Sequence, residues 1–197
     1  MNKKSIVKNL LIVSSLTISG AAFAVTPSAS MLGNTCAGCH GTNGSSNGPA
    51  TPNLAGISSE YFIDAMAEYK EDSRPATIMS RIAKGYTDEE IQLLATFFSE
   101  KKVVSIDQSA NAKKARSGKK IHKKYCEKCH EDGGRSSEDD AGILASQMMP
   151  YLRNTIDDFI SGDRDMPKKM RKRIKSLQKQ KGDKGIDQLI HYYGSQR

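Results

Sequence analysis

Cys36-Ala37-Gly38-Cys39-His40 is a C-x-x-C-H stretch, and it returns 90 residues later as Cys126-Glu127-Lys128-Cys129-His130. The two stretches use all four cysteines of the chain. C-x-x-C-H is the signature of c-type haem attachment. Two thiols at this spacing can add to the two vinyl groups of one porphyrin, and the adjacent histidine then presents a ring nitrogen to the iron. Two such stretches predict two covalently bound haems, rather than a redox dithiol followed by an idle histidine.

The sequence around the two stretches is duplicated at the same spacing. Leu54-Ala55 recurs as Leu144-Ala145. A stripe with helical spacing recurs as well: Tyr61, Phe62, Ala65, Met66 and Tyr69 match Tyr151, Leu152, Thr155, Ile156 and Phe159. No useful length of sequence alternates with a period of two, so strands are not expected. Each half therefore reads as a small helical domain wrapped on one haem.

A last amphipathic helix is predicted near the end of each half. Apolar residues follow the i, i+3, i+4, i+7 pattern in Ile91, Leu94, Ala95 and Phe98, and again in Ile186, Leu189, Ile190 and Tyr193. The spacing here is 95, so the second copy has gained about five residues between its iron ligand and its last helix. Thr87 and Glu90 form a capping box that starts the first of these helices.

The first 24 residues read as a cleaved signal peptide. Three lysines precede an apolar stretch from Leu10 to about Ile18, and Ala22-Phe23-Ala24 resembles a cleavage site. The apolar stretch is shorter than the roughly 20 residues that span a bilayer. No other segment is apolar enough to span, and an uncleaved anchor is the alternative. We expect an exported, periplasmic protein with domains at residues 25–105 and 106–197.

The sixth ligand of each iron decides whether the haem is closed for electron transfer or open for catalysis. His40 and His130 are the proximal ligands, and both remaining histidines, His122 and His191, lie in the second half, where we expect surface or pocket positions. In the first half Met79 is favoured as the sixth ligand. Met31 is too close to the attachment site, and Met66 belongs to an apolar stripe.

In the second half Met170 is favoured because it lies nearly in register with Met79, and Met166 is the alternative. Met148 and Met149 are expected to line the haem pocket. The segment 49–56 is expected near the ring of His40, where a backbone carbonyl would accept its N–H. A simple loop over a propionate edge is the competing interpretation. The second half has no proline at the position that matches Pro52.

Charge is divided unequally between the halves, within an ordinary globular composition of 37% hydrophobic and 26% charged residues. Residues 25–105 hold 6 Lys or Arg against 9 Asp or Glu, whereas residues 106–197 hold 21 against 13. Basic clusters at 113–128 and 168–175 flank the second haem. They favour an acidic redox partner, or are simply a solvated face. Nucleic acid is not expected, because the basic runs lack interleaved aromatic residues.

These residues resemble the dihaem cytochrome subunit of flavocytochrome c sulfide dehydrogenase. The resemblance lies in the two-domain pattern and in Met79–Tyr86, Tyr125–His130, 143–145, 150–152, Met166–Met170, the extra stretch 178–185 and 192–196. It implies an all-α fold of two tandem class I cytochrome c domains related by duplication. It also implies a heterodimer in which an FAD flavoprotein oxidises sulfide and passes electrons through this subunit to a soluble cytochrome.

On this resemblance the chain has no substrate site of its own. The alternative is a stand-alone dihaem electron shuttle of a respiratory chain, which shares everything except the extra stretch at 178–185 and flanking details. A catalytic dihaem enzyme is a third reading, and it requires an open or readily displaced sixth ligand at one haem.

Overall fold

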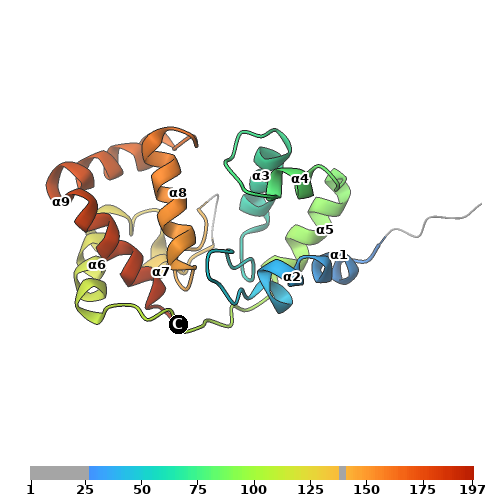
Figure 1. Ribbon diagram of the computed structural model, residues 1–197, viewed down its shortest axis with the longest axis horizontal. Helices are drawn as coiled ribbons and strands as arrows, with labels where there is room; N and C mark the ends of the chain where they lie inside the picture. Colours follow the sequence, from blue (N-terminus) through green and yellow to red (C-terminus); the bar gives the residue numbers. More distant parts are fainter. Residues whose placement is uncertain (1–26, 138–140) are drawn as a thin grey trace, which may run out of the picture.

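The structure is a computed structural model that describes residues 27–137 and 141–197. Within these ranges all regular structure is helical, as predicted, and the chain forms two lobes that follow each other in sequence (Figure 1). The predicted signal peptide, residues 1–24, lies outside the described residues. None of the helices in the described ranges is both long and apolar enough to cross a membrane.

The first lobe contains five α-helices and one short 3-10 turn. They are α1 (Ala29–Thr35), α2 (Ala37–His40), η1 (Thr42–Gly44), α3 (Ser59–Lys70), α4 (Met79–Ala83) and α5 (Asp88–Ser99). Side-chain caps fix where the longer helices begin, because they satisfy backbone N–H groups that have no partner within the helix. Ser58 accepts from the N–H of Tyr61 at the start of α3. Thr87 and Glu90 form the predicted capping box of α5.

The second lobe contains α6 (Ala112–Tyr125), α7 (Glu131–Gly134), α8 (Met149–Ser161) and α9 (Lys168–Gly194). α9 takes the place of both α4 and α5, and it continues through the stretch that is extra in the second copy. It is interrupted at Gly182, whose φ of 60° and ψ of −158° are not helical. Glycine has no Cβ and tolerates this conformation, which lets the helix change direction there. The extra residues thus lengthen a helix.

Backbone hydrogen bonds repeat between the lobes and confirm the duplication. The N–H groups of Leu54 and Ala55 donate to the carbonyl of Gly44, and those of Leu144 and Ala145 donate to the carbonyl of Gly134. The N–H groups of Gly56 and Ser146 donate to Phe98 and Tyr193, respectively. The first set keeps the spacing of 90, whereas the acceptors of the second set lie 95 apart. The five extra residues therefore fall before the last helix, as the sequence predicts.

Each lobe has its own apolar core, in which the first helix crosses the last. α1 packs on α5 in the first lobe, and α6 packs on α9 in the second. Leu94 and Phe98 are almost completely buried in the first core, and Leu177 and Ile186 in the second. Residues 100–111 have no helix and connect the two cores. The boundary at 105/106 falls within this connection, and we keep it as a proposal.

The lobes contact each other through a buried polar seam. The side chain of Gln147 bonds both backbone groups of Asn53: its Oε1 accepts from the N–H and its Nε2 donates to the carbonyl, each at 2.9 Å. The side chain of Asn53 donates in turn to the carbonyl of Ser146 at 2.7 Å. All three residues are at most 8% exposed. This seam fixes the loop 49–56 of the first lobe against the second.

Candidate functional site

All eight predicted haem-binding residues line one cavity of about 2240 Å³ that extends across both lobes. The residues are Cys36, Cys39, His40, Met79, Cys126, Cys129, His130 and Met170. A pocket for a single small ligand measures about 300–1,000 Å³, so this cavity has room for two large groups. The fold thus brings the two sequence motifs, and the methionine predicted for each, to the walls of the same space.

In the first lobe a backbone carbonyl orients the ring of His40. Its Nδ1 lies 2.8 Å from the carbonyl oxygen of Pro52, which accepts the ring N–H. This confirms the predicted role of the segment 49–56. The bond leaves Nε2 as the nitrogen available to a metal, and it fixes the ring orientation. Burial lowers the pKa of His40, which keeps the imidazole neutral as metal ligation requires.

The first cysteine of each C-x-x-C-H stretch is half-buried. Cys36 follows α1 and Cys126 follows α6, each where the chain turns into its C-x-x-C-H stretch. Burial raises the pKa of Cys36, and it raises the pKa of Cys126 to about 11. All four cysteines are free thiols in the structure. Because burial disfavours the thiolate, these positions suit a neutral thioether better than a nucleophile or a metal thiolate.

Two of the three methionines considered in the first lobe line the cavity. Met79 begins α4 and lies half-buried on the cavity wall. Met31 is 64% exposed and does not line the cavity. Met66 is buried in the apolar core, although one side of it also reaches the cavity. Met79 and Met66 thus both line the cavity, and Met79 is the less buried of the two.

In the second lobe both candidate methionines line the cavity. Met170 is half-buried in the first turn of α9, and Met166 is buried just before this helix. His130 lies on the same cavity, where Gly142 occupies the position that corresponds to Pro52. Met170 keeps the register of Met79, so we retain it as the proposed sixth ligand and Met166 as the alternative.

Three residues lie elsewhere than the sequence suggested. Met148 and Met149 were expected in the haem pocket, but Met148 is buried towards Gly48 and Met149 packs against Gly194. His122 is neither at the surface nor in the pocket: it is 1% exposed, and its Nδ1 lies 2.9 Å from the hydroxyl of Tyr193. Because His122 lies on a lysine-rich helix, the sequence did not indicate that its side chain faces the core.

A cluster of arginine and tyrosine between the lobes was not predicted. Arg74 and Arg164 are 5% and 8% exposed and line the cavity. Arg74 donates to the hydroxyls of Tyr61 and Tyr151 at 3.0 and 3.2 Å. Burial would raise the pKa of Tyr61, but the two guanidinium groups outweigh it and lower this pKa to about 8. The sequence did contain an indication of this cluster, because the two arginines lie 90 residues apart, and so do Tyr61 and Tyr151.

The charge of this cluster is incompletely balanced by the protein. Glu68 is the one described carboxylate within salt-bridge distance of Arg74 or Arg164, at 3.0 and 3.7 Å. The Nε of Arg164 has no hydrogen-bond partner among the described residues. A buried, unpaired guanidinium N–H is costly, and a carboxylate in the cavity would satisfy it. The residues therefore fit haem, whose propionates are such carboxylates.

The similarities to known proteins agree with this geometry. A family described as Cytochrome c matches residues 28–100. The cytochrome subunit of sulfide dehydrogenase from Chlorobaculum tepidum is 48% identical over 68 residues, which are 34% of this chain and 61% of that protein. Cytochrome c-554(548) from Halomonas halodenitrificans is 37% identical over 68 residues, which are 33% of this chain and 82% of that protein.

The fold extends the similarity to both lobes. The crystal structure of reduced cytochrome c4 from Pseudomonas stutzeri superimposes with a TM-score of 0.73, covering 87% of this chain and 100% of that one. The sequence identity is 21%, so this likeness concerns the fold alone. The architecture is the predicted one, all-α with two tandem class I cytochrome c domains.

Proposed function

Because the chain belongs to the cytochrome c family, whose members transfer electrons through covalently bound haem c, we propose that it is the dihaem electron-transfer subunit of a sulfide-oxidising complex. The observation that carries the proposal is the 48% identity with the cytochrome subunit of sulfide dehydrogenase. In the proposed complex an FAD flavoprotein subunit oxidises sulfide, and this chain passes the electrons to a soluble cytochrome. We place the complex in the periplasm on the basis of the predicted signal peptide.

One haem would be held in each lobe. Cys36 and Cys39 would anchor the first, and Cys126 and Cys129 the second. His40 and Met79 would be the iron ligands in the first lobe, and His130 and Met170 those in the second. When bound, each haem supplies an iron that alternates between the ferrous and ferric states, and so carries one electron at a time.

The protein's own groups keep the site ready for repeated electron transfer. The carbonyl of Pro52 holds the ring of His40 in one orientation, so this ligand does not rearrange when the charge of the site changes. Arg74 and Arg164 offer buried positive charge to propionates at the seam between the lobes. One cavity holds the predicted ligands of both sites. These features suit an electron path through the whole chain.

Sulfide-dependent reduction tests the proposal. The full chain, matured with haem, is purified with and without a flavoprotein produced from the same genome, and haem absorbance is followed after addition of sulfide. We expect association with the flavoprotein and reduction of two haems per chain. A chain that remains monomeric and is not reduced would instead support the stand-alone shuttle. Carbon monoxide binding by the resting protein would support a catalytic haem with an open iron.

A further inference from the structure

A groove of about 440 Å³ lies between α6 and α9, on the surface of the second lobe. Four exposed lysines line it: Lys120 and Lys124 from α6, and Lys181 and Lys184 from α9. We call these four residues the lysine groove. Among the described residues none of them forms an ion pair, although the lobe contains carboxylates close by in sequence. The positive charge of the groove is therefore available to a partner.

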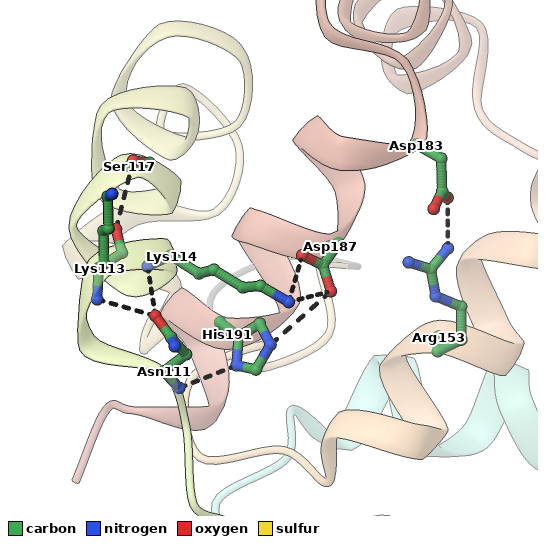
Figure 2. A network of polar contacts seen from close by, with 8 residues as sticks. All are labelled: Asn111, Lys113, Lys114, Ser117, Arg153, Asp183, Asp187 and His191. Atoms are coloured by element: carbon green, nitrogen blue, oxygen red, sulfur yellow. Dashed lines mark hydrogen bonds and ion pairs between the residues drawn. The ribbon is translucent and has the colours of Figure 1, made fainter.

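The acidic residues of the same region are paired elsewhere. Asp183 pairs with Arg153 of α8 at 2.7 Å, and Asp187 pairs with Lys114 of α6 at 3.0 Å (Figure 2). Asp187 also lies 3.7 Å from His191 (Figure 2). These contacts fix α9 after its interruption at Gly182 against both neighbouring helices. Neither carboxylate lines the lysine groove.

The first lobe has no equivalent of this surface. Ser30 and Asn34 occupy the positions that match Lys120 and Lys124 at the spacing of 90. Lys181 and Lys184 belong to the stretch 178–185, where the second copy is longer. The four charges thus occur in only one copy of the duplicated domain. Helix–helix packing alone does not account for them, because exposed lysines contribute little to stability.

The groove is directly connected to the second haem site. Tyr125 lines both the groove and the large cavity, and it immediately precedes Cys126. Its hydroxyl donates to the side chain of Gln180 at 2.6 Å, and the ammonium group of Lys124 lies 5.0 Å from the centre of its ring. Tyr125 is therefore a wall shared by the groove and by the cavity that the second haem would occupy.

We infer that the lysine groove is the docking site for an acidic segment of the protein that exchanges electrons with the second lobe. This inference rests on the proposed function and adds the place and the chemistry of the contact. The four lysines are exposed and spread over two helices, so they present no enclosed cage for one small anion. An extended acidic surface matches them better, because it can meet all four charges at once.

The test uses the haem-loaded chain and a fluorescein-labelled oligoglutamate peptide, with binding read by fluorescence anisotropy at low ionic strength. The groove variant is K120E/K124E/K181E/K184E. The matched control is K113E/R116E/K119E/K123E, which changes the net charge equally on other positions of α6. Haem absorbance and thermal unfolding verify that both variants fold. We expect the groove variant to lose at least about tenfold in affinity and the control much less.

Three results would overturn the inference. Absence of peptide binding to the unaltered chain would remove the site. Equal losses in the two variants would show a general positive field rather than a groove. Displacement of the peptide by sulfate, well beyond that by chloride at equal ionic strength, would indicate a small-anion site. Sulfide-dependent reduction is measured without the peptide, so failure of the proposed function would be seen separately.

Discussion

Met79 lies in the first turn of α4 and Met170 in the first turn of α9. Both residues line the cavity, and each comes after the C-x-x-C-H stretch of its own lobe in the sequence. A thioether sulfur bonded to the iron closes the sixth position and raises the reduction potential. Methionine ligation at each haem thus decides whether that iron is closed to small ligands. Removal of one sulfur at a time separates the two sites.

We predict that M79A and M170A each remove about half of the near-infrared band that methionine-ligated ferric haem displays. Each variant should also gain carbon monoxide binding at one haem, because its iron loses a ligand. M166A is the control and should keep the full band. A loss in M166A together with an unchanged band in M170A would transfer the ligand role to Met166.

His122 illustrates a residue whose role depends on its surroundings. It is buried against Tyr193 and contacts Glu127, whereas the matching residues of the first lobe, at the observed spacings, are Leu32, Phe98 and Ala37. A polar cluster, of which His122 and Tyr193 are buried, thus replaces an apolar one. Burial lowers the pKa of His122, although Glu127 acts in the opposite direction.

This lowered pKa predicts a loss of stability in acid. The unfolded chain takes up the proton first, near the ordinary histidine pKa of about 6.5. The contribution of neutral His122 is therefore complete above about pH 6.5 and declines as the pH falls below it. We expect the thermal midpoint of the haem-loaded chain to fall between about pH 8 and pH 5.5, and H122Q to reduce this fall. H191Q, at a more exposed position, should reduce it less; an unchanged pH profile in H122Q would contradict the prediction.

At the residue scale, the sequence predicted what local chemistry dictates. The C-x-x-C-H stretches are readable because thioether attachment requires a fixed spacing, whereas the ligand role of Met79 stays a prediction. The carbonyl of Pro52 was predictable from the segment that contains it. Arg74 and Arg164 were not predicted as a pair, because their significance arises only where two lobes bury them together. The repetition of these arginines at the spacing of 90 indicates that both copies of the domain use them.

At the scale of elements, the close crossing of the first and last helices shapes each lobe. In the second lobe α6 reaches α9 at Gly118, where a Cβ would lie 2.0 Å from the carbonyl oxygen of Gln188 and 2.7 Å from the Cβ of Tyr192. In the first lobe a Cβ on Gly33 would meet the ring of Phe97. Both glycines thus allow an aromatic residue of the last helix to approach the first helix.

We predict that G118A lowers the free energy of unfolding of the haem-loaded chain by at least about 1–3 kcal/mol. The added methyl group would meet the backbone of α9, which cannot rotate away. K119A, at the exposed position next to Gly118 on α6, is the control. The free energy of unfolding in guanidinium chloride gives the comparison. A loss in K119A as large as that in G118A would show that the crossing is not the cause.

Helix positions followed from apolar periodicity, whereas the length of α9 did not. The sequence indicated that five residues were added, but not that they would extend a helix through Gly182. Lysine and glutamine are good helix formers, and this stretch contains both. The added stretch therefore has a high helix propensity, but Gly182 made two separate helices equally compatible with the apolar pattern. Contacts of Asp183 and Asp187 with neighbouring helices decide the direction of the chain after that point.

At the scale of the whole molecule, the lobes meet through the polar seam and through the arginine and tyrosine cluster. Gln147 satisfies both backbone groups of Asn53, and Gln108 from the connecting segment bonds the carbonyl of Gln147 at 2.9 Å. A buried backbone group without a partner costs about 1–3 kcal/mol. The duplication gave no indication of this seam, because the residues that match Asn53 and Gln147 are Ile143 and Ile57. The asymmetric contact between Asn53 and Gln147 is therefore evident only in the three-dimensional structure.

Loss of this seam should uncouple the lobes without unfolding either one. Q147A leaves the N–H and the carbonyl of Asn53 without their partner, so we expect calorimetric unfolding of the haem-loaded chain to broaden or split into two transitions. Protease cleavage within residues 100–111 should become faster, since the connecting segment loses its support. Q92A, at an exposed position on α5, is the matched control and should leave both measurements unchanged. An undivided transition and unchanged cleavage in Q147A would mean that the arginine and tyrosine cluster alone holds the lobes together.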